Sequence, residues 1–426
     1  MKIAMIHTPI LGRGGGERQI LRLAAELQRM GNEVEIFVSA LNVENSYPDM
    51  LEKLTVHVIP HPLGKKLPRW LKPQGQETAS KPEETQKQNG KSWLQEYMRR
   101  NMGRQFYTIP YDLPSMINIG KNIPKGFDVI NCHNYPSEWA AVAAKKRIKA
   151  PVVWMCNEPP FWFFVPELRK GLRKVNWPVY NLLDKTAVNY IDEIIVLSDI
   201  AAGYVQKAYN CNSLVVRSGV DAERFSKSSG AKIREEYGLE NDFVLLQVGN
   251  IELNKRQEDA VRALKILSEA TSNVKLMFDG GGRRDELVGL VGKLGLQDSV
   301  IFRRSSSDEE LAEVYAACDV FIFPAQITWG LAVVEAMAAA KPVIVSDRCG
   351  ASEIIQNGVN GMVVEHGSPE GIAERVKFLM SDGSVCLKLG KNAHEYVQSQ
   401  LSWKKYSDQM QSIFEKTVAA TQKRID

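Results

Sequence analysis

The sequence has no close pair of cysteines and no long apolar run. Its six cysteines are scattered and none belongs to a C-x-x-C pair, which argues against a zinc site and a disulfide framework and favours reduced cytoplasmic thiols. The longest apolar runs fall well short of the ~18 residues that a membrane-spanning helix needs. The N-terminal stretch MKIAMIHTPI predicts a strand rather than a signal peptide, because no small-residue cleavage site follows its short apolar run. We therefore expect a cytoplasmic protein without a metal centre.

The dinucleotide-binding fingerprint G-x-G-x-x-G is also missing. Gly12 and Gly14 fit its first two glycines, but Glu17 takes the third position, which disfavours a nicotinamide-dependent dehydrogenase. The glycine-rich loop still follows a predicted strand over residues 2–6 and precedes a predicted helix over residues 17–30. This order begins a doubly wound parallel sheet, in which the loop either brings backbone amides close to an anion or is only structural.

What is present is an ordinary globular composition with an uneven charge. The 426 residues are 44% hydrophobic and 24% charged, which suggests two or three domains. Residues 1–212 hold 28 Lys/Arg against 20 Asp/Glu, and the remainder holds 26 against 30. A basic half can meet phosphate, an anionic lipid surface or only solvent. No recognised nucleic-acid-binding module concentrates these charges, so a nucleic-acid partner is disfavoured.

Two segments of the first half interrupt the alternation of strands and helices. Residues 64–103 are largely polar and predict a mobile insertion, although basic residues interleaved with Trp70 and Trp93 could also form a flap or a membrane-surface patch. Residues 161–179 combine aromatic, apolar and basic side chains. That composition is typical of an interfacial segment, or of a partly buried helix over an acceptor cleft. Peripheral association with the inner face of a membrane is therefore one expectation.

Polar side chains end two neighbouring predicted strands of the first half. His133 and Asn134 come at the end of a strand over residues 127–133, and Glu158 follows a strand over residues 151–156. Because ligands of open α/β sheets bind beyond the carboxyl ends of strands, these residues are candidates for a binding site. A histidine that only caps its strand remains the alternative.

The second half repeats this arrangement around two features. Lys255 and Arg256 follow a predicted strand over residues 243–250, near the start of a helix, where two cations would neutralise a diphosphate. Further on, a short buried strand leads to Gly330, which opens a helix, and Glu335 lies one turn into it among small apolar residues. Burying such a carboxylate is costly without hydrogen-bond partners. Glu335 therefore either reaches solvent past the helix end or accepts bonds from ligand hydroxyls.

Together these motifs resemble the retaining glycosyltransferases of family four, a group with the GT-B fold. The matching residues run along nearly the whole chain: Gly14-Gly15-Gly16-Glu17-Arg18, Asp128-Val129-Ile130 with His133, Ser218-Gly219-Val220-Asp221 with Phe225, Val248-Gly249 with Lys255, and GLAVVEAMAAAKPVIVSD from Gly330, with Gly350 and Glu353 after it. The last motif is very specific and the first loop moderately so. The resemblance implies two Rossmann-like, doubly wound α/β domains facing a central cleft. Residues 1–212 would bind the acceptor, residues 213–399 the nucleotide-sugar, and a helix over about 400–426 would cross back to the first domain.

The resemblance also implies an activity. It would move a hexose of the mannose or glucose type from a UDP- or GDP-linked sugar to a lipid-linked or glycan acceptor, retaining the anomeric configuration without a metal or other cofactor. Donor contacts are expected from Gly15, Gly16, Asn250, Lys255, Arg256, Arg303, Thr328, Gly330, Leu331, Ala332 and Glu335. Acceptor contacts are expected from Glu17, Arg18, His133, Asn134 and Glu158. His133, Lys255 and Glu335 are the expected catalytic residues.

Two positions depart from the family pattern. The family usually has a glutamate eight residues before Glu335 that touches the donor sugar, and here Ile327 stands in that position. Asn250 stands where an arginine often follows the glycine of Val248-Gly249. The missing carboxylate leaves a second hypothesis open: a non-catalytic nucleotide-sugar-binding protein that acts as a sensor or partner subunit.

Overall fold

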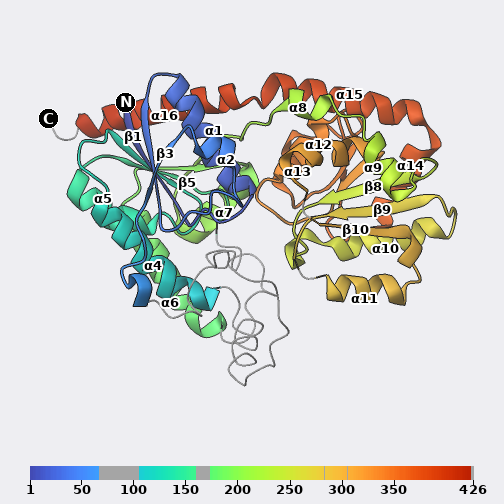
Figure 1. The fold of residues 1–426 in the computed structure, drawn as a ribbon, viewed down its shortest axis with the longest axis horizontal. Helices are drawn as coiled ribbons and strands as arrows, with labels where there is room; N and C mark the ends of the chain where they lie inside the picture. Colours follow the sequence, from blue (N-terminus) through green and yellow to red (C-terminus); the bar gives the residue numbers. More distant parts are fainter. Residues whose placement is uncertain (67–104, 160–172, 283, 305, 424–426) are drawn as a thin grey trace. The chain divides into compact units, whose positions relative to one another are not determined.

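The computed structural model describes residues 1–66, 105–159, 173–282, 284–304 and 306–423 (Figure 1). The chain divides into two compact units. Unit 1 contains Met1–Val196, Ala201–Val216 and Ser407–Asp426, and unit 2 contains Leu197–Ile200 and Arg217–Tyr406. Most of the insertion expected over residues 64–103, and residues 161–172 of the expected interfacial segment, lie outside the described residues.

Unit 1 is built on a seven-stranded sheet in the order β3-β2-β1-β4-β5-β6-β7, in which every strand pair is parallel. Its strands are β1 (Lys2–His7), β2 (Glu33–Val38), β3 (Thr55–Val58), β4 (Val129–His133), β5 (Val152–Met155), β6 (Glu193–Val196) and β7 (Leu214–Val215). Its helices are α1 (Gly15–Arg29), α2 (Pro48–Leu51), α4 (Gln105–Asn122), α5 (Trp139–Ile148), α6 (Arg173–Val188), most of α7 (Asp199–Tyr209) and most of α16 (Trp403–Gln422), with the 3-10 turn η1 (Gly64–Lys66).

Unit 2 is built on a six-stranded parallel sheet in the order β10-β9-β8-β11-β12-β13. Its strands are β8 (Phe243–Val248), β9 (Val274–Asp279), β10 (Val300–Arg303), β11 (Val320–Phe323), β12 (Val343–Ser346) and β13 (Met362–Val364). Its helices are α8 (Ala222–Ser226), α9 (Ala231–Tyr237), α10 (Gln257–Ser268), α11 (Asp285–Lys293), α12 (Asp308–Ala317), α13 (Leu331–Ala338), α14 (Pro369–Ser381) and α15 (Gly383–Gln400), with 3-10 turns η5 (Leu253–Lys255), η6 (Gln297–Ser299) and η7 (Gly350–Ile354).

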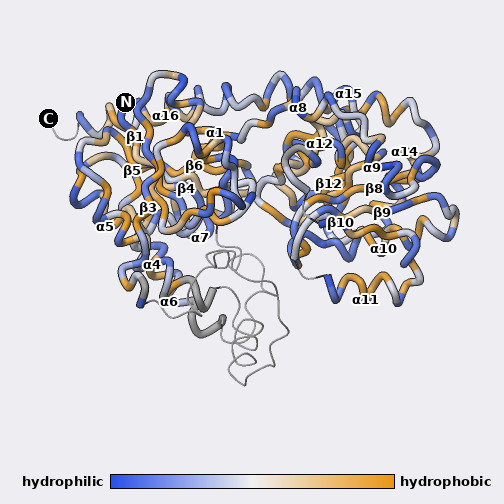
Figure 2. The backbone as a smooth tube through the Cα atoms, in the orientation of Figure 1, coloured by the Kyte–Doolittle hydropathy of each residue, from blue (hydrophilic) through white to orange (hydrophobic). Residues whose placement is uncertain are grey.

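The strands of both sheets are largely hydrophobic along their length (Figure 2), so both faces of each sheet need helices to cover them. In unit 1 helices α4, α5, α6 and α7 pack on one face around the buried Trp139 and Trp154, while α1 packs against β1 and β2. In unit 2 helices α10, α11 and α14 pack on one face, and Tyr315 of α12 contacts Phe321 on the other. The doubly wound α/β class predicted from the sequence is confirmed for both units.

Most predicted elements appear within two or three residues of their predicted ends. The final helix, expected over about residues 400–426, is α16, and residues 401 and 402 separate it from α15. There Val220 donates a backbone hydrogen bond to Leu401 at 2.8 Å, and a β-carbon on Gly219 would overlap with the backbone of Trp403. At the same point the Ser402 hydroxyl accepts from the Lys405 amide at 3.1 Å and caps the start of α16.

Candidate active site

In unit 2 the strand order reverses between β8 and β11, and residues after these two strands form the candidate donor site. Gly249 turns the chain after β8 with a φ of 134°, and η5 then ends at Lys255. The side-chain amide of Gln247 donates to the Lys255 carbonyl oxygen at 2.8 Å, which ties this loop to β8. The Lys255 ammonium lies 5.3 Å from the ring centroid of Phe323, at the end of β11.

The Lys255 ammonium forms no ion pair with a carboxylate in the described part of the chain. It does act on Cys349: burial raises the pKa of that thiol to about 12, and the positive charge of Lys255 opposes the rise. An ammonium without a counter-ion beside the ends of two strands attracts an anion, and a diphosphate fits that requirement.

Gly330 begins α13 in the left-handed region, with a φ of 104°. A β-carbon there would lie 2.8 Å from the Cys349 sulfur and 3.4 Å from the Phe323 ring, so both the backbone angle and the space require glycine. Gly330 and the Lys255 ammonium thus both lie beside the Phe323 ring. Because the first amides of a helix have no acceptor within it, the half-buried Leu331 and Ala332 at this end add to the positive potential near Lys255.

Backbone bonds fix the loop that leads to Gly330. The Thr328 carbonyl accepts from the Ser198 hydroxyl at 2.5 Å, and Thr328 is fully buried. Ile327 donates to the Arg348 carbonyl at 3.2 Å and accepts from the Gly350 amide at 2.9 Å. The Ile327 side chain is itself buried, so an apolar group is packed at the position where the family pattern has a carboxylate.

Glu335 is only 4% exposed, so the alternative in which it reaches solvent is wrong. The Tyr315 hydroxyl donates a hydrogen bond to Oε2 of Glu335 at 2.9 Å. Tyr315 is fully buried, with its ring 5.5 Å from that of Phe225 and 5.6 Å from that of Phe321. The tyrosine therefore satisfies and orients a carboxylate whose burial would otherwise be costly.

Replacing Tyr315 with phenylalanine is expected to raise the KM for the sugar donor about tenfold, because a hydrogen bond to a charged group contributes about 1.5–3 kcal/mol. Steady-state kinetics at varied donor concentration measures this, and Tyr190→Phe is the matched control because Tyr190 lies in unit 1, before the amino end of β6, with its ring beside the Lys146 ammonium. An unchanged donor KM in a folded Tyr315→Phe variant would contradict the positioning role.

Three other residues were expected to contact the donor, and of these two are paired with carboxylates and one is exposed. Arg256 donates to the Asp259 carboxylate at 2.8 and 2.9 Å, and the buried Arg303 pairs with Asp279 at 3.3 Å. Asn250 is exposed at the start of the loop that leads to Lys255. Their contacts with a donor stay predictions. Lys255 differs from both arginines because it has no carboxylate partner within the described ranges.

In unit 1 the strand order reverses between β1 and β4, and a histidine ends each of these strands. His7 and His133 are register partners and both are fully buried. Burial lowers the pKa of His7, although the Glu17 carboxylate opposes the shift, and burial with the nearby His7 lowers the pKa of His133 well below its ordinary value. Both imidazoles are therefore neutral at pH 7. Neither ring nitrogen of His133 has a hydrogen-bond partner among the described residues.

Amide side chains surround the two histidines. Asn134 follows β4 with a φ of 64° and its side-chain nitrogen lies 2.8 Å from Nε2 of His7. Asn157 follows β5 and donates to the side-chain oxygens of Asn134 and, at 2.5 Å, of Gln19 on α1. Gly16 lies against Asn134, because a β-carbon on this glycine would overlap with the amide.

The other predicted residues of unit 1 lie at the start of α1 or after β5. Gly15 is exposed, Glu17 folds back over Gly14, and the Arg18 guanidinium lies 5.6 Å from the Tyr47 ring. Glu158 is exposed beyond β5. The structure thus brings Gly16, His133 and Asn134 together, and the roles of all these residues toward an acceptor stay predictions.

Four residues of these sites were not identified from the sequence: His7, Gln19, Asn157 and Tyr315. The strand-end argument that selected His133 also applies to His7 and Asn157, which end or follow strands β1 and β5. Nothing in the sequence signals Tyr315, because its partner is 20 residues further along the chain.

Replacing Gly16 with alanine is expected to displace Asn134 and lower kcat/KM for transfer at least tenfold, since small misplacements at a reacting centre have large effects on rate. Gly12→Ala is the matched control, because a β-carbon there meets nothing within 4 Å. Equal activity of the two variants would show that the space beside Asn134 is not needed.

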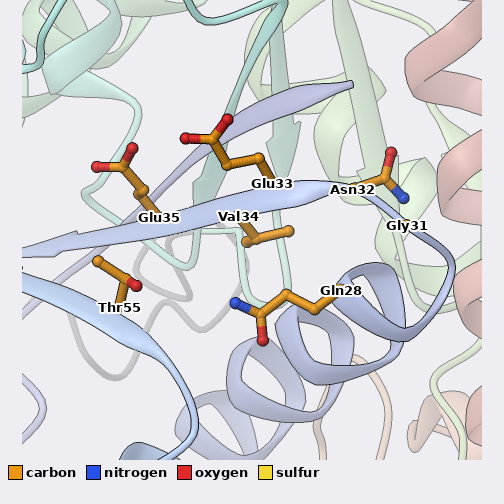
Figure 3. A pocket seen from close by; sticks show the side chains of 7 residues that line it. All are labelled: Gln28, Gly31, Asn32, Glu33, Val34, Glu35 and Thr55. Atoms are coloured by element: carbon orange, nitrogen blue, oxygen red, sulfur yellow. The ribbon is translucent and has the colours of Figure 1, made fainter.

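A cavity of about 760 Å³ lies elsewhere in unit 1 (Figure 3). It is lined by Gln28, Gly31, Asn32, Glu33, Val34, Glu35 and Thr55. Glu33 and Thr55 begin β2 and β3, so the cavity is at the amino ends of the strands, away from His7 and His133. Its carboxylates are paired with Lys2 and His57. It is therefore not the candidate site.

Among the described residues, no group of three or more His, Cys, Asp or Glu side chains is arranged to hold a metal ion. No helix in that part of the chain is long and apolar enough to cross a membrane.

Two family models match successive parts of the chain. The model described as Glycosyltransferase Family 4 matches residues 79–224, and the model described as Glycosyl transferases group 1 matches residues 230–396, which includes Lys255, Gly330 and Glu335. The chain belongs to glycosyltransferase family four. The members of this family are enzymes. The resemblance found from the sequence motifs is therefore confirmed.

This glycosyltransferase is similar to curated proteins along much of its length. It is 28% identical over 282 residues to the putative glycosyltransferase EpsD of Bacillus subtilis (strain 168), which covers 63% of this chain and 71% of EpsD. It is 29% identical over 292 residues to the GDP-mannose-dependent alpha-(1-6)-phosphatidylinositol monomannoside mannosyltransferase of Mycobacterium tuberculosis (strain CDC 1551 / Oshkosh), covering 64% of this chain and 73% of that enzyme.

Solved structures confirm the GT-B fold of this glycosyltransferase. Anabaena Alr3699/HepE, solved with UDP and glucose, superposes with a TM-score of 0.70 and 19% identity, covering 98% of this chain and all of that chain. At that identity the likeness concerns the fold alone.

Proposed function

We propose that this glycosyltransferase transfers a hexose from a nucleotide-diphosphate sugar to a lipid-linked or glycan acceptor, with retention of configuration and without a metal. Unit 2 binds the donor and unit 1 binds the acceptor. The observation that carries the proposal is the Lys255 ammonium, which has no carboxylate partner among the described residues and lies beside the Phe323 ring, as does Gly330 at the start of α13. The cation and the helix amides together attract the negative charge of a diphosphate.

The chemistry follows from that electrostatic arrangement. The bond between the anomeric carbon and the phosphate oxygen breaks, and the acceptor oxygen forms the new bond from the same face. The acceptor hydroxyl proton passes to the departing phosphate oxygen. Lys255 and the α13 amides stabilise the charge that develops on the diphosphate, which lowers the barrier most if they are positioned beforehand.

Relatives support the donor and acceptor classes of this proposal. One relative is named as GDP-mannose-dependent and acts on a phosphatidylinositol mannoside, and one structural neighbour was solved with UDP and glucose. We therefore propose a GDP- or UDP-linked hexose as the donor and a lipid-linked glycan as the first acceptor class to test. No observation favours the non-catalytic alternative.

The test has a binding arm and a turnover arm. Thermal shift with UDP, GDP and ADP identifies the nucleotide, because a ligand that binds the folded state raises its apparent stability once the concentration exceeds Kd. Release of nucleoside diphosphate from the matching sugar is then measured with membrane lipid extract as acceptor, with and without EDTA. Donor binding without release for any donor and acceptor pair would refute the proposal, and loss of turnover in EDTA would refute its metal independence.

A further inference from the structure

The polar residues at the carboxyl ends of β1, β4 and β5 form one directional chain of hydrogen bonds. Nδ1 of His7 lies 2.9 Å from the Thr8 carbonyl oxygen, and since a carbonyl only accepts, Nδ1 carries the proton. In the neutral ring Nε2 then has the lone pair, which accepts from the Asn134 amide nitrogen at 2.8 Å. The tautomer of one histidine therefore fixes the direction of the Asn134 amide.

The same direction continues through two more amides. Because Asn134 turns its nitrogen toward His7, its oxygen accepts from the nitrogen of Asn157. That nitrogen also donates to the side-chain oxygen of Gln19 at 2.5 Å, so the Gln19 nitrogen stands at the far end of the chain. This last nitrogen is buried without an acceptor among the described residues, in a side chain that is 3% exposed.

A buried donor without an acceptor is costly, and an ordered series of amides that ends in one suggests a ligand. The second observation is His133, register partner of His7, whose two ring nitrogens are also buried without partners in the described part of the chain. The side chains that form this chain of hydrogen bonds are neutral amides and a neutral imidazole, and the Glu17 carboxylate acts on His7. Such surroundings favour an uncharged hydroxyl over a phosphate or a carboxylate.

We infer that His7, Asn134 and Asn157 are positioning residues that hold the Gln19 amide as a hydrogen-bond donor to a neutral hydroxyl of the sugar acceptor. The inference rests on the proposed function, which supplies the acceptor. It goes further by naming the residues that orient the acceptor and by assigning each amide a direction.

Two isosteric substitutions test different members of this chain of hydrogen bonds. Asn157→Asp removes the donor in the middle, so Asn134 must turn its nitrogen to the new carboxylate and its oxygen to His7, and Nε2 of His7 must then hold a proton. Gln19→Glu keeps the oxygen that accepts from Asn157 and replaces the terminal donor with a second carboxylate oxygen. Ring ¹⁵N spectra of the full chain, with His7 assigned through His7→Gln, are expected to show the proton on Nδ1 in the wild type and in Gln19→Glu, and a ring protonated at Nε2 in Asn157→Asp.

Kinetics tests the positioning role separately. With the donor and lipid extract that support turnover, both variants are expected to lose about 10- to 100-fold in kcat/KM for the acceptor, with the donor KM unchanged. A His7 ring that keeps its proton on Nδ1 alone in Asn157→Asp, or wild-type acceptor kinetics in both variants, would overturn the inference. If the wild type releases no nucleoside diphosphate with any pair, the proposed function fails, while the ring spectra still decide whether the directional chain exists.

Discussion

Replacing Lys255 with methionine is expected to lower kcat about 100- to 1000-fold, the loss typical of removing one preorganised group that stabilises transition-state charge. Methionine keeps the length of the side chain and its packing near Phe323 but removes the ammonium that has no carboxylate partner in the described residues. Donor affinity is expected to fall less, about tenfold, because the diphosphate carries more charge as the bond to the sugar breaks. Initial rates of nucleoside diphosphate release, with donor binding by calorimetry, measure the two effects.

Lys391→Met is the matched control for this experiment. Its ammonium is exposed on α15 and lies 3.8 Å from Oε1 of Glu395, so its loss should leave kcat within a factor of about two. Arg256→Met gives a second comparison, because the Asp259 carboxylate already holds that guanidinium. If Lys255→Met kept the wild-type kcat while Arg256→Met lost it, the cation at the diphosphate would be Arg256.

The strands and their carboxyl ends could be predicted from the sequence because apolar runs and glycine-rich turns are local signals. That reasoning correctly placed His133 at the end of a strand, Lys255 in the loop after a strand and Gly330 at the start of a helix. The reversal of strand order between β8 and β11, and between β1 and β4, could not be read from the pattern, yet it is what brings Lys255 close to Gly330 and His7 close to His133. Strand order is a property of long-range pairing.

Side-chain partners were the least predictable part of the candidate site. A buried glutamate needs a donor, but the sequence could not show that Tyr315, on the preceding helix, supplies it to Glu335. Arg256 and Lys255 are adjacent cations in the sequence, and only the fold shows that Asp259 pairs with Arg256 and leaves Lys255 without a carboxylate among the described residues. Partner choice depends on side-chain directions that spacing alone does not determine.

A pair of buried carboxyl groups in unit 1 gives the second large expected effect. Glu138 and Asp184 are both fully buried. Burial raises the pKa of Asp184 to about 7, against the hydrogen bond that its Oδ1 accepts from Nε1 of Trp139 at 2.8 Å. Burial, with the neighbouring Asp184, also raises the pKa of Glu138 well above its ordinary value. Both groups therefore favour the protonated form in the folded enzyme.

The sign of the pH dependence follows from these directions. A carboxyl whose pKa is higher in the folded state than the ordinary 3.8 contributes its full stability below about pH 3.8, and that contribution is lost as the pH rises through about 7. Between these limits the unfolded chain releases the proton and the folded enzyme keeps it. The free energy of unfolding of unit 1 should therefore decrease over this range because of Asp184.

Replacing Asp184 with asparagine is expected to stabilise the enzyme near neutral pH by a few kcal/mol, because the amide cannot ionise and its oxygen can still accept from Trp139. At about pH 4.5 the difference between the variant and the wild type should be much smaller, since most of the wild-type loss occurs between that pH and about 7. Urea unfolding of the full chain across this pH range, followed by tryptophan fluorescence, measures the difference, with the exposed Asp49→Asn as the control.

A stability difference that stays the same from about pH 4.5 to 7.5 would show that Asp184 does not titrate with a raised pKa. A gain that grows with pH in Asp184→Asn, and again in Glu138→Gln, would show that unit 1 keeps protons on a buried acidic pair beside the strand that ends at His133.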